Sequence, residues 1–579
     1  MDVQQRISWT ASVLAGVLAL AGSVSAGAQG RVPREVPEPY TPAPDAKDLK
    51  SVLFNWTRNQ GMLKGHDERD MVASLEYQGT GTIQVDGQPC MLAKYRASTN
   101  YQSFSQRIQY ECKKSNGQSY SNIEVVSGLY AWDEDKPGAE IDGTKGKAKP
   151  MPSAVQERLI RFWASPQGAP KAAIAGTTDT FWLGANPGTL FDDGKNKVGQ
   201  TSVAWEGGKP VITFPLPGVP GATATATLDS KFMTERVVVK QGSTTREFTY
   251  SDYKDWNNPL NLIDVFYAGK LTERKNGTVI RDLTTKQTET GNVYVVAPVP
   301  ASVKAAMKVS GEMPHGVMAK TEPSVDRSKP TPRLGEHPDL NGSWSWNDWI
   351  GNYMTGGGRR CAPTQPSDCN RQVNQTYDFE LYSPSRFGNL GRPIYKPQYW
   401  DKVQELDMWT NKNDPVMTCQ PLGVPREGPP RRIYQTAKDV TFLYTGGDAG
   451  GGYGEYRVVP TDGRKHDPNR QETNYLGYTV GRWEGDALVL DSINFVDTTW
   501  FGRGGFFHSD KMHVIERFTR QGDALLYDVT VEDPDVLAEP YVYPTRVVRA
   551  NANPDAGLIA ERGNCEVYET QDITSQIRH

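Results

Sequence analysis

Histidine and acidic residues gather in one stretch near the end of the chain, in an order that could support metal chemistry. The 579 residues include only seven histidines, and three of them are His466, His508 and His513. Three nitrogen or oxygen ligands plus a water molecule make a hydrolytic zinc site. These histidines, with Asp497 or Glu516, are therefore candidate zinc ligands.

The same stretch could instead hold a general acid and a general base, as in lyases, isomerases or hydrolases. The candidate catalytic residues are His508, His513, Glu516 and Asp497. The spacing limits how they can pair, because His513 is five residues after His508 and three residues before Glu516. In a regular strand, odd offsets point side chains to opposite faces. His508 lies before the expected strand and could still reach a barrel mouth.

A third interpretation gives these residues a structural role. Arg464 follows Asp462 by two residues, and such arginine–carboxylate pairs tie loops together. The histidines would then be hydrogen-bonded side chains at a barrel rim. Trp344, Trp483 and Trp500 could line a ligand cavity, but tryptophans of this kind more often belong to a hydrophobic core.

Several common site signatures are absent from the sequence. Because there is no Gly-x-Ser-x-Gly, the nucleophile elbow of an α/β-hydrolase is not expected. The glycine-rich segment 446–452 is followed by an expected strand and not by a helix, so it lacks the helix N-terminus that binds phosphate. Lys and Arg number 64 against 68 Asp and Glu, a net charge of −4, which argues against a nucleic-acid partner. Zinc is the only cofactor that the residues suggest.

The first 28 residues are typical of a secretory signal peptide. Arg6 precedes an apolar run over 7–21, and small residues follow at 24–28, where signal peptidase needs them. The alternative is an uncleaved anchor, but the run is short and no later run approaches the roughly 20 apolar residues of a membrane span. We therefore expect a periplasmic or extracellular protein with no transmembrane segment after cleavage.

The even number of cysteines also fits an exported chain with disulfides. Six cysteines permit 15 pairings. Two local pairs suggest themselves, one on consecutive strand-like runs and one across a short proline-containing loop, which leaves a third pair closing a long loop. The expected pairs are Cys90 with Cys112, Cys361 with Cys369, and Cys419 with Cys565.

The elements that must position these residues fall into two β-rich regions. A proline-rich leader over 29–46 and a linker over 309–337 separate candidate domains at 47–308 and 338–579. In the first domain, short alternating runs are separated by turns such as Asp86-Gly87 and Asn116-Gly117, which predicts antiparallel hairpins. One helix is predicted there, since Val155, Leu159, Phe162 and Trp163 share helical spacing after Pro152.

The first domain resembles periplasmic lipoprotein-carrier proteins, which sort outer-membrane lipoproteins. The likeness is in the segment 228–239 followed by 248–253, which is similar to the closing strands of those proteins. The resemblance implies a curved antiparallel sheet that forms an open half-barrel around an apolar cavity and binds a lipid-like ligand. The alternative is an unrelated β-sandwich with a filled core.

The second domain resembles lipocalins and other calycins at its start. Gly342-Ser343-Trp344 is similar to their opening motif, which implies that the tryptophan plugs one end of a barrel. Strand-like runs then recur every 10 to 20 residues or so, as in an up-and-down barrel. Segments 413–419, 424–426 and 532–534 resemble a large group of uncharacterised exported proteins of soil bacteria, a group with no settled activity.

These observations predict a mainly β protein with two antiparallel β domains, a half-barrel crossed by a helix and then a calycin-like barrel. The leading hypothesis is that it binds or carries a hydrophobic, lipid-like or terpenoid-like molecule. The alternative is an acid–base or zinc-dependent enzyme acting on a hydrophobic substrate in the C-terminal barrel. A third possibility is a structural envelope protein that binds partner proteins through a large exposed surface.

Overall fold

The fold is described from a computed structural model of the chain. It describes residues 42–551 apart from 65–68, 71, 73, 102, 142–144, 178–199, 256–264, 291–292, 310–324, 346–392, 408–412, 445–454, 503–504 and 544. All of these residues belong to the compact unit Tyr40–His579. The predicted signal peptide and most of the leader lie outside the described residues.

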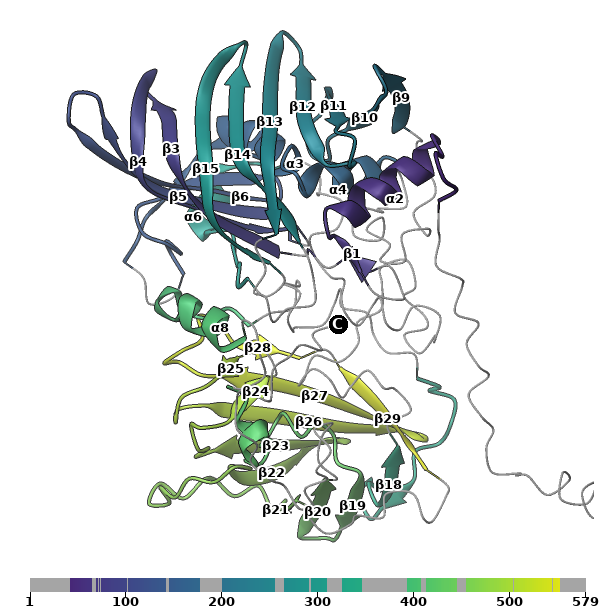
Figure 1. The fold of residues 1–579 in the computed structure, drawn as a ribbon. Helices are drawn as coiled ribbons and strands as arrows, with labels where there is room; N and C mark the ends of the chain where they lie inside the picture. The colour runs from purple at the N-terminus through teal and green to yellow at the C-terminus, as the bar shows by residue number, and fades with distance from the viewer. Residues whose placement is uncertain are drawn as a thin grey trace, which may run out of the picture. The chain divides into compact units, whose positions relative to one another are not determined.

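The first sheet has thirteen antiparallel strands in the order β8-β7-β6-β5-β4-β3-β15-β14-β13-β12-β11-β10-β9 (Figure 1). Nearly every strand therefore pairs with its neighbour in sequence, as a series of hairpins requires. The exception is the β15–β3 pair, which joins the last strand of the sheet to the first. The strands are β3 (Ser74–Val85), β4 (Gln88–Asn100), β5 (Ser105–Lys114), β6 (Ser119–Ser127), β7 (Tyr130–Glu134), β8 (Ala148–Pro150), β9 (Ser202–Glu206), β10 (Lys209–Pro215), β11 (Ala222–Leu228), β12 (Thr234–Gln241), β13 (Thr244–Asp255), β14 (Phe266–Lys275) and β15 (Thr278–Thr290).

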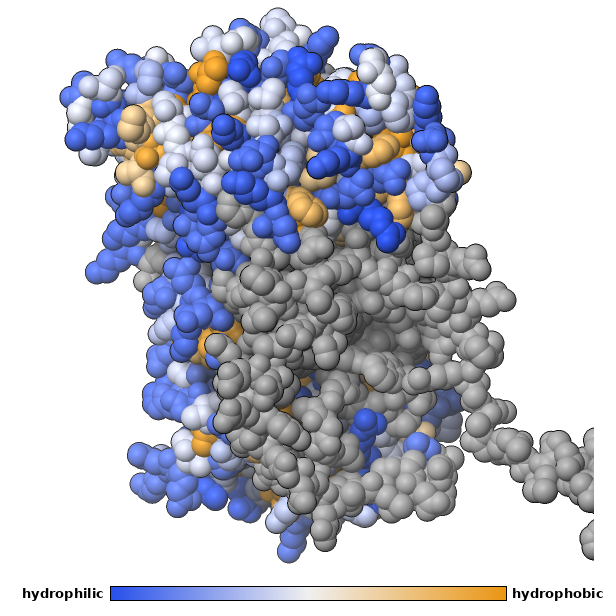
Figure 2. Space-filling model, viewed as in Figure 1, coloured by the Kyte–Doolittle hydropathy of each residue, from blue (hydrophilic) through white to orange (hydrophobic). Residues whose placement is uncertain are grey.

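The predicted hairpin turns are present. Asp86 and Gly87 connect β3 to β4 and both have positive φ angles, 51° and 73°. This is the backbone of the tight turn that suits two twisted strands, and glycine adopts it without steric cost. Along β10 and β11, buried residues alternate with more exposed ones. Figure 2 agrees, because the described surface around this sheet is mostly hydrophilic on the face shown, with scattered hydrophobic residues.

The helices of this region cross one face of the sheet because of its strand order. β8 and β9 follow each other in sequence but lie at opposite edges, so the chain between them must traverse the sheet. It does so as α3 (Val155–Trp163) and α4 (Gly168–Ala175). The prediction of a helix here is confirmed, with Leu159, Phe162 and Trp163 all 0% exposed.

Contacts of α3 show that the sheet curves around it. Arg158 of α3 donates hydrogen bonds to the Val125 carbonyl of β6 at 2.8 Å and to the Trp132 carbonyl of β7. Just past the end of α3, the Ala164 carbonyl accepts a hydrogen bond at 2.7 Å from the Tyr250 hydroxyl of β13. Strands β6 and β13 are far apart in the sheet order, so only a strongly curved sheet can reach the helix from both sides. The half-barrel crossed by a helix is therefore present.

Two more helices flank this region. α2 (Leu49–Asn59) starts at Asp48, whose carboxylate accepts a hydrogen bond from the Ser51 backbone amide and caps the helix. Its Trp56 ring nitrogen donates to Thr234 of β12 at 2.8 Å. α6 (Ala301–Ala306) is a short helix that follows the last strand of the sheet.

The second sheet has ten strands and is a nearly closed barrel. Its main path is β21-β20-β19-β18-β29-β27-β26-β23-β22, and β28 pairs with β27. The two ends of the path meet, since the Gly463 amide after β21 donates to the Gly481 carbonyl of β22 at 3.1 Å. The strands are β18 (Gly342–Ser345), β19 (Arg432–Gln435), β20 (Asp439–Tyr444), β21 (Glu455–Pro460), β22 (Tyr478–Glu484), β23 (Ala487–Ile493), β26 (His513–Gln521), β27 (Ala524–Glu532), β28 (Tyr541–Val542) and β29 (Arg546–Ala550).

Side chains from opposing strands fill the barrel. The rings of Phe442 in β20 and Phe518 in β26 have centroids 5.2 Å apart, although the two strands are well separated in the sheet order. Trp344 is 2% exposed, and the guanidinium of Arg520 lies 5.2 Å from its ring centroid. The remaining small elements are β1 (Leu63–Lys64), β2 (Arg69–Asp70), β16 (Arg333–Leu334), β17 (His337–Pro338), β24 (Trp500–Gly502), β25 (Phe506–Phe507), α8 (Trp400–Asp407) and short 3₁₀ turns at Pro152–Ala154, Pro397–Tyr399 and Pro415–Thr418.

The disulfide prediction is confirmed for one pair. Cys90 of β4 and Cys112 of β5 are bonded, with their Cα atoms 5.5 Å apart. Cys419 is also disulfide-bonded, but the other three cysteines lie outside the described residues, so its pairing stays a prediction. The domain boundaries also stay predictions. Within the described ranges, no helix combines the length and apolar character that crossing a membrane requires.

Candidate functional site

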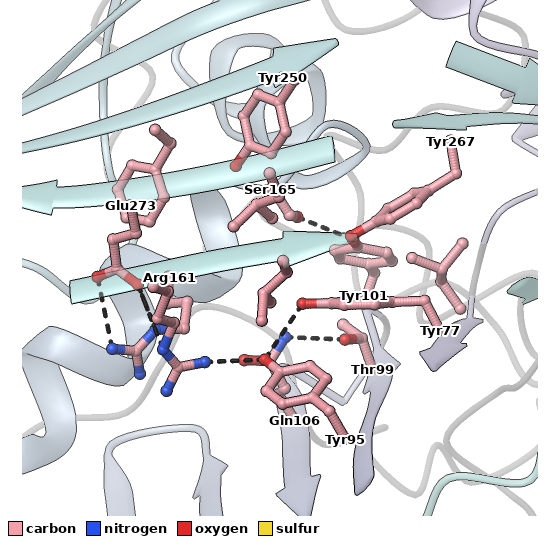
Figure 3. Close-up of a pocket in the computed structure, with 15 residues that line it drawn as sticks. Tyr77, Tyr95, Thr99, Tyr101, Gln106, Arg161, Ser165, Tyr250, Tyr267 and Glu273 are labelled. Carbon is pink, nitrogen blue, oxygen red and sulfur yellow. Dashed lines mark hydrogen bonds and ion pairs between the residues drawn. The ribbon is translucent and has the colours of Figure 1, made fainter. Parts of the chain in front are cut away.

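A small cavity lies between the concave face of the thirteen-stranded sheet and the crossing helices (Figure 3). Five tyrosines dominate its lining, and four apolar side chains complete its walls. The cavity measures about 10 Å³, which is room for roughly one water molecule. The tyrosines are Tyr77, Tyr95, Tyr101, Tyr250 and Tyr267, and the apolar residues are Leu75, Phe248, Leu271 and Leu283.

The tyrosine hydroxyls make hydrogen bonds around this cavity. Those of Tyr77 and Tyr95 lie 3.4 Å apart, and the hydroxyl of Tyr101 lies 3.0 Å from that of Ser165 beyond α3. Burial, the main cause, raises the pKa of Tyr77 and of Tyr250 well above 10. The hydroxyls therefore stay neutral and can both donate and accept a hydrogen bond.

Charged side chains form one wall of the cavity. The Glu273 carboxylate of β14 binds Arg161 of α3 at 3.0 Å and Arg246 of β13 at 2.6 Å. A second carboxylate, that of Glu124 in β6, lies near the same arginines. Arg281 of β15 contacts both carboxylates, at 3.5 Å from Glu273 and 3.3 Å from Glu124. Burial alone would raise the pKa of Glu124, but the positive charges of Arg281, Arg161 and Arg158 bring it down to about 2. The network holds the helix to both sides of the curved sheet.

The cavity differs from the one that the resemblance implied. An open, apolar cavity was expected, whereas the described residues enclose a small space with aromatic, hydroxyl and charged walls. The difference arises because α3 and α4 fill the concave face, and α4 is made mainly of small residues that pack closely. The tyrosines could have been noticed in the sequence, because Tyr77, Tyr95 and Tyr250 lie on the short strand-like runs of the first domain.

His508 is buried in the second sheet region, just before β26. It is 3% exposed, and its Nδ1 donates to the Ser509 carbonyl at 2.9 Å, so Nε2 accepts from the Thr499 hydroxyl at 2.9 Å. Desolvation is the main cause that lowers its pKa. Asp497 is exposed and makes a weak electrostatic contribution to His508. Both nitrogens of this neutral ring are thus occupied by the protein.

His466 and His513 share one carboxylate on the outside of the barrel. Asp491 Oδ1 lies 2.8 Å from His466 Nε2 and 3.0 Å from His513 Nε2, and His513 Nδ1 lies 3.1 Å from Glu532. All four side chains are partly exposed. The hydrogen bond from His513 is the main cause that lowers the pKa of Asp491 to about 2. The same bond is the largest cause that raises the pKa of His513.

Glu516 points into the barrel, away from His513. It is 0% exposed and accepts two hydrogen bonds from Arg457 of β21, at 2.7 Å and 2.9 Å. The Tyr527 hydroxyl donates a third at 2.8 Å. The opposite orientation of His513 and Glu516 is the one their offset of three predicts. Arg457 and its partner Tyr444 were not foreseen from the sequence.

The structure therefore distributes the predicted residues over three places. His466 and His513 lie together on the outer surface, His508 is buried near exposed Asp497, and Glu516 is inside the barrel. In the part of the chain that the structure describes, no three His, Cys, Asp or Glu side chains are placed to hold a metal ion. The zinc site and the acid–base set stay predictions with no shared geometry to support them. The predicted Asp462–Arg464 pair is present, at 2.6 Å on the surface.

Comparisons with known proteins add little to this geometry. No protein-family model matches the chain, and no curated protein matches it. Among solved structures, a LolA superfamily protein from Nitrosomonas europaea aligns over 45% of this chain and 100% of its own length. The identity is 9% and the TM-score is 0.24. Because a TM-score this low does not establish a relationship, the proposals below rest on the described residues.

Proposed function

We propose that the half-barrel binds a hydrophobic molecule that also carries polar groups, such as a lipid-like or terpenoid-like compound. The observation that carries this proposal is the enclosed cavity between the curved sheet and the crossing helices, with its walls of tyrosine rings and hydroxyls. Tyrosines offer apolar faces and hydrogen-bonding tips at one place. Sites for small molecules combine these properties in the same way.

Binding in this cavity requires the helices to move, because the described cavity has room for roughly one water molecule. The backbone of α3 and α4 pairs with no strand of the sheet, so the helices can shift while the strands stay paired. Such a shift must break side-chain contacts such as the Arg161–Glu273 ion pair and the Tyr250–Ala164 hydrogen bond. The bound form would expose the four apolar side chains and the tyrosine rings to the ligand. In the free form, the helices pack against these side chains and occupy the space that the ligand would fill.

The Cys90–Cys112 disulfide supports the proposal that the protein binds its ligand outside the cytoplasm. Disulfides persist in oxidising compartments and are rare in the cytosol. We therefore propose that the ligand is bound in the periplasm or outside the cell. Envelope proteins that deliver or receive the ligand would be the partners.

A ligand-retention experiment tests the proposal. The full mature protein, purified from the periplasm, is examined by native mass spectrometry and then extracted with organic solvent. The affinity for the fluorescent probe N-phenyl-1-naphthylamine is measured on delipidated protein. We expect a bound lipid or terpenoid, and saturable probe binding once it is removed.

Two matched variants locate the binding. Leu283→Phe adds volume at the cavity, where Leu283 is 3% exposed, whereas Leu490→Phe makes the same change in the core of the barrel. We expect the first to weaken probe binding at least fivefold and the second to leave it unchanged. If L283F fails to fold by circular dichroism, Tyr267→Phe replaces it. Equal effects of the cavity and barrel variants, or no saturable binding by the wild-type protein, would overturn the proposal.

A further inference from the structure

Two adjacent rows of side chains face the cavity from β13, β14 and β15. Paired residues of neighbouring strands have their side chains on the same face of a sheet, so the register places Tyr250, Leu271 and Leu283 in one row. The next row, two positions along each strand, includes Glu273 and Arg281. All five residues line the cavity (Figure 3). The sheet therefore brings polar and charged groups of its own to the cavity, whatever the position of the helices.

The charged row of the sheet is balanced without the helices. Arg281 contacts Glu273 at 3.5 Å and Glu124 of β6 at 3.3 Å. Arg246 of β13 contacts Glu273 at 2.6 Å. Two arginines therefore face two carboxylates, and all four side chains belong to the same sheet. Among these four groups, neither sign of charge is in excess.

The helix that must shift takes a counter-charge with it. Arg161 of α3 binds Glu273 at 3.0 Å, and it also contacts Glu157 of the same helix at 3.2 Å. Glu157 contacts Arg246 at 2.5 Å as well, and Arg246 keeps Glu273 as a partner on the sheet. Displacing α3 therefore moves one positive and one negative charge away from Glu273 and Arg246 together.

A wall that is balanced in this way favours an uncharged ligand. Burying an ion costs free energy unless a partner of opposite charge is present. A carboxylate ligand would need an arginine that is not already paired, and an ammonium ligand would need such a carboxylate. The arginines and carboxylates of the charged row already pair with one another. The other arginine of α3, Arg158, binds Asp133 of β7, and neither residue lines the cavity.

Tyr250 shows which polar group the ligand must supply. Its hydroxyl donates to the Ala164 carbonyl just past α3, at 2.7 Å, so a shift of the helices breaks this hydrogen bond. By contrast, the Tyr95 hydroxyl of β4 accepts at 2.8 Å from Arg281 of the same sheet and keeps its partner. A buried hydroxyl that loses its acceptor costs free energy. The ligand therefore has to place an acceptor where the carbonyl oxygen was.

We propose that the polar group of the ligand is an uncharged oxygen acceptor, as in a long-chain ketone, ester or alcohol, which replaces the Ala164 carbonyl at the Tyr250 hydroxyl. This inference rests on the function proposed above and names the chemical class of its ligand. Leu271 and Leu283, in the same row as Tyr250, contact the alkyl part. Acids and amines of the same chain length bind poorly wherever they are ionised.

Competition on the delipidated full mature protein tests the charge of the ligand. The probe is N-phenyl-1-naphthylamine, and the competitors are 2-undecanone, decanoate and decylammonium, which have similar chain lengths. At pH 8 we expect 2-undecanone to bind at least tenfold more tightly than either ion. The affinity for decanoate should rise, by up to tenfold for each pH unit, as the pH falls and the neutral acid forms. The affinity for 2-undecanone should stay constant over the same range.

Two tyrosine variants of β13 test the acceptor. Tyr250→Phe removes only the hydroxyl, and the probe, which contains no oxygen, serves as the reference. Because the variant also loses the bond to Ala164, any easier opening raises both affinities alike. The ratio of 2-undecanone affinity to probe affinity should therefore fall roughly fivefold, as expected for one lost hydrogen bond. Tyr253→Phe is the matched control and should leave the ratio unchanged, because Tyr253 donates to the Thr234 carbonyl at 2.7 Å and does not line the cavity.

The outcomes separate this inference from the function on which it rests. Decanoate or decylammonium that binds at pH 8 as tightly as 2-undecanone would overturn the inference and leave hydrophobic binding by the half-barrel in place. An affinity ratio in Y250F equal to that of the wild type would do the same. If Y250F fails to fold by circular dichroism, the pH series on the wild-type protein still decides the charge. A wild-type protein without saturable probe binding would overturn both proposals.

Discussion

The two sheets fill their interiors in different ways. The thirteen-stranded sheet is filled by helices of its own chain, because its strand order sends the β8–β9 connection across the concave face. The barrel is filled by side chains of opposing strands, such as Phe442 and Phe518. A helix can move as a unit, whereas interdigitated side chains cannot. The half-barrel is thus the interior better suited to admit a large ligand, and the barrel the one better suited to hold fixed polar groups.

The two interiors also differ in how their buried carboxylates are paired. In the half-barrel, three arginines surround Glu273 and connect α3 to β13, β14 and β15. In the barrel, one arginine and one tyrosine satisfy Glu516, and Glu427 has no donor among the described residues. The first arrangement is saturated and joins separate elements. The second leaves the buried oxygens of Glu427 without a hydrogen bond from the described residues.

The largest effect is expected from removing a buried carboxylate charge. Glu273→Gln leaves three buried arginines without their shared partner, and it should destabilise the full chain by about 3–5 kcal/mol. Glu516→Gln removes the partner of a single arginine and should cost less. The midpoint of urea-induced unfolding of both variants gives the comparison. A greater loss in E516Q than in E273Q would contradict the view that the network is the main link between helix and sheet.

A smaller effect separates the helix filling from the side-chain filling. Phe162→Leu in α3 and Phe442→Leu in β20 each shorten a ring that is 0% exposed, and each should cost about 1–2 kcal/mol. Their effects on ligand entry should differ, because only Phe162 belongs to an element that must move. Stopped-flow mixing with N-phenyl-1-naphthylamine measures this. We expect faster probe binding in F162L and an unchanged rate in F442L.

Local features of this fold could be predicted from the sequence, because local spacing determines them. The α3 helix followed from apolar residues at helical spacing, and the Asp86-Gly87 turn from its need for positive φ angles. The Cys90–Cys112 bond followed from adjacent strands. By contrast, α4 was missed because its buried alanines show no amphipathic period, and α2 was missed although Asp48 caps it.

The candidate sites could be predicted less well, because they depend on which strands meet. Strand periodicity correctly placed His513 and Glu516 on opposite faces. It could not show that Glu516 faces Arg457, which lies 59 positions earlier. Nor could it bring Tyr77 near Tyr267, whose ring centroids lie 5.0 Å apart, since that contact requires the β15–β3 closure. Glu427 follows directly after a segment that was singled out, but its burial could not be read from its neighbours.

The pH dependence of stability should have opposite signs at two buried carboxyls. The pKa of Glu124 is lowered from 4.5 to about 2, so its contribution is present above pH 4.5 and is lost as the pH falls toward 2. The pKa of Glu427 is raised, so its burial costs more stability as the pH rises above 4.5. Glu124→Gln should therefore destabilise the protein near neutral pH, by about 1–3 kcal/mol, and Glu427→Gln should stabilise it there. Unfolding midpoints between pH 3 and pH 8 measure both trends, and a common sign for the two variants would contradict this assignment.

The smallest effects should come from ion pairs on the two surfaces. Lys94 and Glu111 lie 2.9 Å apart on the first sheet, with exposed fractions of 74% and 53%, and Arg464 lies beside Asp462 on the second. Their geometry resembles that of the interior pairs, but water screens exposed charges, and two long side chains must be held in place. Lys94→Gln and Arg464→Gln should therefore leave the urea midpoint unchanged within error at low and at high salt. A shift in the urea midpoint as large as that of F162L, in either variant, would contradict this expectation. Surface charge would then contribute to stability as strongly as the filling of the two interiors. The contrast between those interiors would not be what sets the stability of the chain.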